Sequence, residues 1–428
     1  MSTTIEHFNS LSIATVTTDT SDICKAYISI DLHEANSSTD QAAFLTLGEM
    51  LLSGTSTQSR DELLYAINAL GATVSITVTD GWLTIALTGH SSVWNKLITI
   101  LVTLLTDSTF SAAEIKRVKE LVKNALHDHK ENARTIAVEN LRNQFYNQTD
   151  RRATVPIPKL QKEVAGLKSQ EIKAVYKRAF NKQWFVSVVG PQTATTKLTT
   201  ALRTVTDKIT VQEQPVKTTS KVNNVSTVVT AEIPSKQNIE LSIGFPLTIT
   251  RNDLDYIPLQ FGMAVLCKWG GFAGRLMSTV REKEGLTYSI YGKIETGDSH
   301  TPGYFRIMTF FNPAQANQGL SSTFREIKKI HKNGITESEL DSFKTILKTQ
   351  TILRKDSPLR ELYALHAYHR SGYSLSDIKE YESAFQSVSK AEVDAAIKKY
   401  LVPKAFTVSI AGPVKLVKKD LEKLVNKV

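Results

Sequence analysis

The sequence WFVSVVGP at residues 184–191 recurs as AFTVSIAGP at residues 405–413. Each copy is a run of β-branched, aromatic and other apolar residues that ends at Gly-Pro, a pattern typical of a buried strand. A helical pattern precedes each copy, at residues 171–180 and at residues 391–400. A helix followed by a buried strand is therefore predicted twice in the chain.

The repeat extends further upstream. A capping box at Ser111 and Glu114 opens a long predicted helix, and Thr336 with Glu339 forms the same motif in the second copy. All three landmarks recur with a shift of about 220 to 225 residues, and three matches in register indicate an internal duplication. We predict an α+β fold built as a tandem duplication of two homologous domains, residues 1–210 and 211–428, with a polar linker at residues 206–226.

Local patterns predict several elements inside each copy. Residues 73–79 and 82–88 alternate polar and apolar side chains around Asp80-Gly81, a strong signal for a β-hairpin. Apolar spacing predicts a helix at residues 38–52 that ends before Gly54. The second copy is predicted to begin with a strand near Thr227, with its hairpin partner at residues 239–245.

The chain is basic, with a net charge of +10 and a pI of about 9.3. The basic residues are scattered, and the one tight cluster lies near the C-terminus. A cluster of this kind is more often the solvated face of a terminal helix than a nucleic-acid site, and we expect the former. Its members are Lys415, Lys418, Lys419, Lys423 and Lys427.

Neither a membrane span nor an export signal is evident. No run of about twenty apolar residues occurs, and residues 1–10 lack a charged-then-apolar signal pattern. The two cysteines, Cys24 and Cys267, are far apart and predict neither a disulfide framework nor a Cys-based zinc site. We therefore expect a cytoplasmic protein without a membrane span.

Two histidine pairs are candidates for a metal site. His366 and His369 have i, i+3 spacing on a predicted helix, whereas His127 and His129 would face different ways. Neither pair has a carboxylate at the spacing that a helical zinc hydrolase requires, so partly exposed histidines are the favoured interpretation. No Gly-x-Ser-x-Gly motif occurs, and Cys267 is expected in the core.

The most informative stretch is LCKWGGFAGRLMSTVREKEGLTY at residues 266–288. A glycine-dense loop leads into a helix-compatible run at residues 275–283, which Gly285 ends. Apolar and polar residues then alternate from Leu286, as in a strand. The pattern places Arg281 and Tyr288 near the junction of a loop, a helix and a strand.

This stretch resembles the second-half signature of the pitrilysin/insulinase (inverzincin) family of zinc metallopeptidases. That signature is a Gly-Gly-Gly-x-x-Ser-Arg-Leu run followed by Arg-Glu-x-x-Gly-Leu-x-Tyr. The resemblance covers essentially the whole chain and implies two halves, each a β-sheet with helices packed mainly on one face. Active members carry His-x-x-Glu-His followed by Met-Leu-x-x-Gly-Thr, and only the second motif is present here, at residues 50–55.

Counting back from Met50 places Leu45, Gly48 and Glu49 where the family has a ligand His, the general base and a second ligand His. The family's third ligand falls near Thr135, one turn from Glu139. Leucine offers nothing to a metal, glycine cannot accept a proton, and one carboxylate cannot hold zinc tightly. The resemblance therefore implies no catalytic zinc and no cofactor in this chain.

The second half keeps the residues that the family uses beside the metal. By the resemblance, Tyr288 would donate a hydrogen bond to the scissile carbonyl, and Arg281 would assist nearby. Ser75 stands where active halves tend to have Asn on an edge strand, and with Gly270 and Gly271 it is a candidate for the substrate chamber. The residues alone leave another interpretation open, in which Arg281 forms a helix-end salt bridge and Tyr288 is a strand-core aromatic.

The resemblance implies the zinc-less subunit of a heterodimeric metallopeptidase. Such a subunit is no enzyme on its own, and it completes the peptide chamber and active site of a homologous zinc-bearing partner. Two alternatives stay open. One is a structural or scaffold homologue without a role in proteolysis. The other is an autonomous metallopeptidase with an unusual site, for instance through His366 and His369.

Overall fold

The computed structural model describes residues 1–32, 37–79, 81–148, 150, 152–211, 227–267, 274–295 and 301–426. These residues form two compact units. Unit 1 contains the described residues of Met1–His127, Val155–Lys217 and Ile352–Ile378, and unit 2 those of Asp128–Thr154, Thr218–Thr351 and Lys379–Val428. Each unit therefore includes one segment from the opposite half of the sequence. Most of the expected linker lies outside the described residues, and the boundary after residue 210 remains a prediction.

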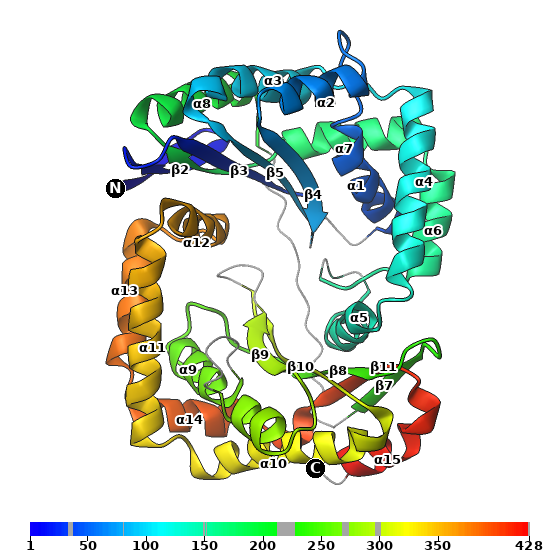
Figure 1. Cartoon of the computed structure of the whole chain (residues 1–428), viewed down its shortest axis with the longest axis vertical. Helices are drawn as coiled ribbons and strands as arrows, with labels where there is room; N and C mark the ends of the chain where they lie inside the picture. The colour runs from blue at the N-terminus through cyan, green and yellow to red at the C-terminus, as the bar shows by residue number, and fades with distance from the viewer. Residues whose placement is uncertain are drawn as a thin grey trace. The chain divides into compact units, whose positions relative to one another are not determined.

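Unit 1 contains one mixed β-sheet (Figure 1). Its strands are β1 (Ser2–Phe8), β2 (Leu11–Thr17), β3 (Ile23–Asp31), β4 (Thr73–Thr79), β5 (Trp82–His90) and β6 (Trp184–Gly190). They lie in the order β1-β2-β6-β3-β5-β4, and only the β2–β6 pair is parallel. The predicted hairpin is confirmed as the β4–β5 pair, in which Thr79 lies opposite Trp82. Asp80 of the turn lies outside the described residues.

Unit 2 contains the second sheet. Its strands are β7 (Thr227–Glu232), β8 (Ile239–Pro246), β9 (Ile290–Glu295), β10 (Tyr304–Phe311) and β11 (Thr407–Gly412), in the order β7-β11-β8-β10-β9. β7 and β11 are parallel, and the other neighbours are antiparallel. β7 and β8 were predicted to form a hairpin, but this is wrong because β11 lies between them. The strand that repeats β6 thus takes the position that β6 takes in unit 1.

The two sheets share one topology. In unit 1 the order β2-β6-β3-β5-β4 follows the same pairing pattern as β7-β11-β8-β10-β9 in unit 2, and β1 is an additional strand. The predicted α+β fold and its internal duplication are therefore confirmed.

Helices cover one face of each sheet and bury the main cores. In unit 1 these include α1 (Ser38–Met50), α3 (Trp94–Thr106), α7 (Ser169–Phe180) and α8 (Gln192–Thr206), with α2 (Arg60–Ala69), α4 (Ala112–His129) and α6 (Ile157–Gly166) nearby. In unit 2 they include α9 (Tyr256–Cys267), α10 (Ala316–Asn333), α14 (Lys390–Tyr400) and α15 (Lys418–Val425), with α11 (Glu337–Lys355) and α13 (Leu375–Ser387).

The opposite face of each sheet is covered in part by one helix from the other half of the sequence. In unit 1, α12 (Pro358–Arg370) packs Leu362 and Leu365 on strands β2 and β6. In unit 2, α5 (Ala133–Phe145) packs Ala133 and Ala137 on β7, β11 and β8. Side chains of β6 pack on both faces of the sheet. Val186 belongs to the main core of unit 1, whereas Val189 belongs to the cluster that contains Leu362 and Leu365 of α12.

Candidate functional site

The degenerate zinc motif lies on α1 and faces apolar neighbours. Gly48 is buried, and a β-carbon added there would lie 3.6 Å from the side chain of Val78 and 3.8 Å from the carbonyl oxygen of Ile76 on strand β4. Leu45 is partly buried and packs on the unit 1 core, whereas Glu49 is exposed. Two of the three positions therefore serve packing, and the third carries an exposed carboxylate. One carboxylate alone does not suit zinc, which is usually held by three or four side chains.

The retained MLLSGT motif has a structural use. Met50 and Leu51 are buried in the core. Gly54 has a φ of +122°, which an L-residue rarely adopts, and the amide of Thr55 donates a hydrogen bond to the carbonyl oxygen of Gln58. The motif therefore closes the turn after α1 without any metal chemistry.

The histidine pair on α12 is buried, so the expectation of partly exposed rings is wrong. His366 is 8% exposed and His369 is 2% exposed. Nε2 of His366 lies 2.9 Å from the hydroxyl of Ser29, and Nε2 of His369 lies 2.6 Å from the hydroxyl of Ser12. The hydroxyl of Ser187 on β6 joins the two rings, 3.0 Å from Nδ1 of His366 and 3.4 Å from Nδ1 of His369.

The surroundings of this histidine–serine cluster disfavour a positive charge on either imidazole in the folded state. Burial, with Arg370 and His369 as further causes, lowers the pKa of His366 to about 3. Burial and the nearby His7 lower the pKa of His369 to about 4. Both rings are therefore neutral at physiological pH. Within the described ranges, no group of three or more His, Cys, Asp or Glu side chains could hold a metal ion.

The other candidate groups for chemistry have structural surroundings. An oxygen of Glu139, on α5, lies 3.2 Å from Nε2 of His129 and raises the pKa of that histidine. Cys267 is fully buried, which confirms its predicted place in the core, and burial raises the pKa of its thiol far above the usual value. A thiol in this state is not a nucleophile.

Arg281 lies in a π-helical segment, η2 (Met277–Lys283), rather than in an ordinary α-helix. The backbone amide of Glu284 bonds to the carbonyl oxygen of Thr279, five residues back. Gly285, with a φ of +65°, ends the segment as predicted. Extended π-helical geometry is rare and often occurs at functional sites.

Tyr288 lies in the loop between η2 and β9 and is 75% exposed. The strand begins only at Ile290, so the interpretation of Tyr288 as a strand-core aromatic is wrong. Leu286 and Thr287 are buried, and the hydroxyl of Thr309 donates a hydrogen bond to that of Thr287. The loop is thus anchored directly before Tyr288, whose phenol is exposed to solvent, and Ile290 is buried just after it.

The guanidinium carbon of Arg281 lies 4.8 Å from the centroid of the Tyr288 ring. This distance is within the range of a cation–π interaction. The structure therefore brings the two predicted site residues of the second half together, and it holds the cation against an exposed phenol.

Two ion pairs fix the segment that carries Arg281. Arg275 donates to both carboxylate oxygens of Glu339, each at 2.6 Å, and to the carbonyl oxygen of Gly334. Burial opposes ionisation of Glu339, but hydrogen bonds from Arg275 and Thr336 lower its pKa. Glu284 accepts hydrogen bonds from Ser322 and Arg325. No local sequence signal links Arg275 to the capping box of α11, because 64 residues separate Arg275 from Glu339.

The substrate-chamber candidates divide between described and undescribed residues. Ser75 is exposed on β4, which ends the strand order of the unit 1 sheet and is therefore an edge strand. Gly270 and Gly271 lie outside the described residues, as does the rest of 268–273.

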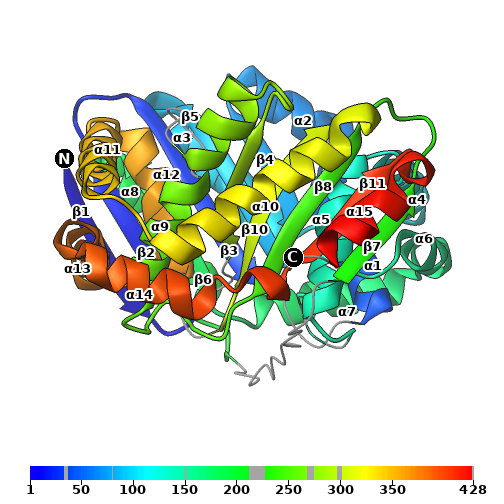
Figure 2. The same ribbon diagram turned by 90° about the horizontal axis from the view of Figure 1, so that it is seen from below.

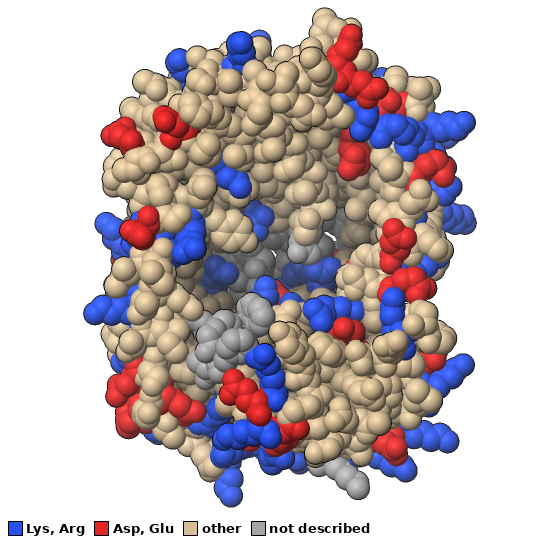
Figure 3. Space-filling view, in the orientation of Figure 1, with Lys and Arg blue, Asp and Glu red and all other residues tan. Residues whose placement is uncertain are grey.

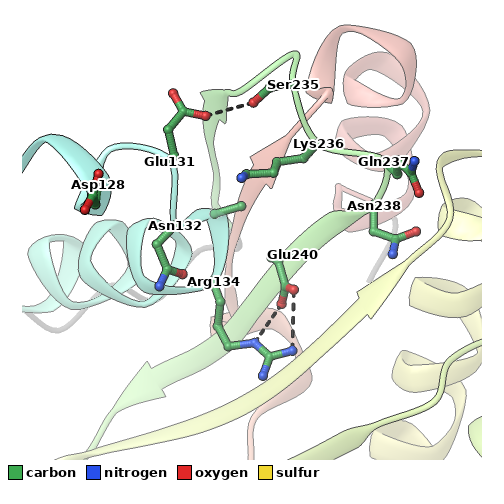
Figure 4. A pocket seen from close by; sticks show the side chains of 10 residues that line it. Asp128, Glu131, Asn132, Arg134, Ser235, Lys236, Gln237, Asn238 and Glu240 are labelled. Carbon is green, nitrogen blue, oxygen red and sulfur yellow. Dashed lines mark hydrogen bonds and ion pairs between the residues drawn. The ribbon is translucent and has the colours of Figure 1, made fainter.

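Unit 2 also has a pocket of about 840 Å³ where the start of α5 meets the connection between β7 and β8 (Figure 4). Its polar lining includes an ion pair between Arg134 and Glu240 and a hydrogen bond from Ser235 to Glu131. The lining carries both charge signs and does not define one ligand chemistry. None of the sequence-predicted site residues contributes to it.

The described helices include none that is long and apolar enough to cross a membrane.

Figure 3 shows Lys and Arg side chains interspersed with Asp and Glu side chains on the face in view.

Parts of the chain are similar in sequence to known proteins. Residues 166–347 match the family described as peptidase M16 inactive domain. The chain is 29% identical over 97 residues to the chloroplastic stromal processing peptidase of Pisum sativum, and 26% identical over 129 residues to the non-peptidase homolog YmxG of Helicobacter pylori. These matches cover 23% and 30% of this chain, and only 8% and 29% of those two proteins.

Solved structures share the fold over nearly the whole chain. A peptidase M16 inactive domain from Pseudomonas fluorescens is 20% identical with a TM-score of 0.81, covering 96% of this chain and 98% of that one. A protease from Helicobacter pylori is 12% identical with a TM-score of 0.80, covering 96% and 99%. The periplasmic protease PqqL from Escherichia coli has a TM-score of 0.71 at 14% identity, and the match covers 95% of this chain and 44% of that one.

The resemblance to the pitrilysin-type peptidases is therefore confirmed in its non-catalytic form. Residues 166–347 match the M16 inactive domain, and this match and the partial similarity to YmxG support a non-catalytic, peptidase-like protein.

Proposed function

We propose that this chain is the zinc-less subunit of a heterodimeric pitrilysin-type metallopeptidase. Its partner is a homologous subunit that carries His-x-x-Glu-His and the zinc ion. The pair cleaves peptides, and this chain supplies Arg281 and Tyr288 to the partner's active site. The two chains together enclose the peptide chamber, and Ser75 on the β4 edge contributes to its wall.

The observation that carries the proposal is the arrangement of Tyr288. A tyrosine that is 75% exposed, beside buried Leu286 and Thr287, presents its hydroxyl from a fixed backbone. A ring left in water contributes little burial energy to the isolated chain, and its cation–π contact with Arg281 is weak at an exposed site. The same arrangement suits a hydrogen-bond donor that acts on a group outside the chain.

The chemistry follows from the two side chains. A phenol donates one hydrogen bond and a guanidinium carries a permanent positive charge, and both favour the negative charge that develops on a scissile carbonyl oxygen. Arg281 lies over the Tyr288 ring at 4.8 Å, so the two groups act on one small region of space. Neither group requires a metal in this chain.

The first half contributes no such chemistry in this proposal. Among the positions of the lost zinc motif, Gly48 packs against β4 and Leu45 packs on the unit 1 core, and only Glu49 keeps a polar side chain there. Unit 1 then serves as a wall and as a specificity surface. Its exposed edge strand β4 is the feature that a bound peptide would meet.

The test is reconstitution with the His-x-x-Glu-His homologue encoded in the same genome. Each chain is purified alone, and the two are then mixed and followed by size-exclusion chromatography with light scattering, zinc analysis and cleavage of a quenched fluorescent peptide. A one-to-one complex, with zinc in the partner and activity only in the mixture, supports the proposal. Zinc and activity in this chain alone would overturn it.

The scaffold alternative gives a different result in the same experiment. A complex that forms but whose activity is insensitive to substitution of both Arg281 and Tyr288 would favour a structural role. The expected cytoplasmic location is tested separately by fractionation of cells that express the tagged chain.

A further inference from the structure

Positive charge is concentrated on a few helices of unit 2. Residues 316–333, which form α10, and residues 390–426, which include α14 and α15, contain twelve Lys and Arg residues against five Asp and Glu residues. The difference of +7 compares with +10 for the whole chain. About an eighth of the sequence therefore carries most of the net charge, and charge this uneven points to an anionic partner.

These three helices are neighbours in space. α10 contacts both α14 and α15, and Figure 2 shows α10 in front with the other two beside it. Their apolar sides are buried in the unit 2 core, through residues such as Leu320, Ile397 and Leu421. Their basic residues therefore face solvent. We call this surface the basic face.

Seven exposed lysines of the basic face have no carboxylate partner among the described residues. Six lie on the three helices, and Lys415 lies in the short 3-10 turn η5 (Val414–Leu416), which precedes α15 and belongs to the basic face. The six are Lys328, Lys329, Lys332, Lys398, Lys419 and Lys423. Other basic residues of these helices do pair, for example Lys399 with Asp255 and Lys390 with Asp394. The seven charges are thus not neutralised by any carboxylate in the described part of the chain. Lys427, which belongs to the same cluster in the sequence, lies outside the described residues.

Two exposed aliphatic side chains accompany the lysines. Leu416 is 71% exposed and lies between Lys415 and Lys418, and Val402 is 41% exposed just before Lys404. No other large hydrophobic residue in these segments is comparably exposed among the described residues. An apolar side chain surrounded by lysines is the combination that peripheral membrane-binding surfaces use.

We propose that the basic face docks this protein on the surface of a bilayer that contains anionic phospholipids. The unpaired lysines contact headgroup phosphates, and Leu416 inserts at the boundary between headgroups and acyl chains. The protein binds peripherally and reversibly. This function is separate from the proposed pairing with a peptidase subunit, since it uses no residue of that site.

The composition of the basic face favours lipid over nucleic acid. Nucleic-acid surfaces combine Arg, which bonds to phosphates and bases through its planar fork, with exposed aromatic rings for stacking. Here Arg325 is paired with Glu284, the seven unpaired cations are all lysines, and the exposed apolar residues are aliphatic. Lysine clusters of four to eight residues are the usual mark of binding to anionic lipid headgroups.

The test is co-sedimentation of the full chain with large vesicles. We expect binding to vesicles with about 30 mol% phosphatidylglycerol, weakening as salt rises, and no binding to pure phosphatidylcholine. Each lysine near an anionic surface contributes roughly fivefold to affinity, so a variant with K328Q, K332Q, K415Q and K419Q should bind about 600-fold more weakly. Leu416→Ser should lower affinity roughly tenfold and leave the salt dependence unchanged.

A matched variant separates the basic face from net charge alone. K96Q, K116Q, K162Q and K197Q remove four exposed lysines of unit 1 that also lack a described carboxylate partner. This variant should bind anionic vesicles like the wild type. Equal losses in both variants, equal binding to neutral vesicles, or no binding to anionic vesicles would each overturn the proposal. So would tighter binding to a short RNA duplex through the same four lysines of the basic face.

Discussion

Acidification is expected to destabilise unit 1 through the two buried histidines of α12. The folded pKa is about 3 for His366 and about 4 for His369, against 6.5 for an unperturbed imidazole. At pH values between the folded pKa of each ring and 6.5, the unfolded chain binds protons that the folded chain does not. Stability therefore falls as the pH drops below about 6.5, and the loss stops growing once the folded rings also become protonated.

The magnitude follows from the size of the two shifts. About pH 5 is about 1.5 units below the unfolded pKa of each histidine, so each ring lowers the free energy of unfolding by about 2 kcal/mol. The two rings together then contribute a loss of about 4 kcal/mol relative to neutral pH. This is a large part of the 5–15 kcal/mol that stabilises a typical domain.

The assay is urea denaturation followed by tryptophan fluorescence at several pH values. Trp82, Trp94 and Trp184 all lie in unit 1. The ring centroid of Trp82 is 4.8 Å from the guanidinium carbon of Arg370 on α12, so its emission also reports whether that helix is docked. The unfolding midpoint should shift to lower urea as the pH falls from about 6.5 to about 4.

A double variant, H366Q and H369Q, should lose most of this pH dependence because amides do not titrate. His127→Gln is the matched control, since His127 is exposed on α4 and should leave the pH dependence unchanged. The same slope in the double variant as in the wild type would refute the reasoning. If the double variant does not fold, NMR titration of the wild-type imidazoles decides, and ring pKa values near 6.5 would count against the buried cluster.

Two further predictions test the packing around the candidate sites. Gly48→Ala should leave the free energy of unfolding unchanged or raise it by up to about 1 kcal/mol, because a β-carbon fits at 3.6 Å from Val78. Gly48→Glu should lower it by about 1–3 kcal/mol, because the longer side chain must displace Val78. Urea midpoints measure both variants, and equal stability of the two would contradict the packing. Arg275→Ala should cost about 1–3 kcal/mol, because it leaves the half-buried Glu339 without its bidentate partner. Arg60→Ala is its control, because the one ion-pair partner of Arg60 among the described residues is the solvent-exposed Asp61. A similar cost for both variants would argue against a role for the Arg275 ion pair.

The sequence predicted what local patterns and repetition encode. The hairpin of β4 and β5 and the end of η2 at Gly285 follow from turn residues that act within a few positions. The duplication follows from the recurrence of the same local motifs along the chain. β11 between β7 and β8 could not be predicted this way, because about 160 to 180 residues separate the paired strands and pairing over such distances leaves no local signal.

The candidate site was predicted less completely than the fold. Comparison with the family motif identified Arg281 and Tyr288, but the exposed loop position of Tyr288 depends on where β9 begins, and element boundaries are weakly encoded. The burial of His366 and His369 was missed for a different reason. Their partners, including Ser12 and Ser187, lie 179 to 357 residues away on strands of unit 1.

The central claim, that this chain lends Tyr288 to a partner's active site, is tested most directly by the kinetics of the reconstituted pair. Tyr288→Phe removes one hydroxyl and should lower kcat by about two to three powers of ten with little change in KM, as expected for a donor that acts in the transition state. Tyr65→Phe makes the same change at another exposed tyrosine and should have no effect. An unchanged kcat for Tyr288→Phe in an active, fully assembled pair would contradict the account.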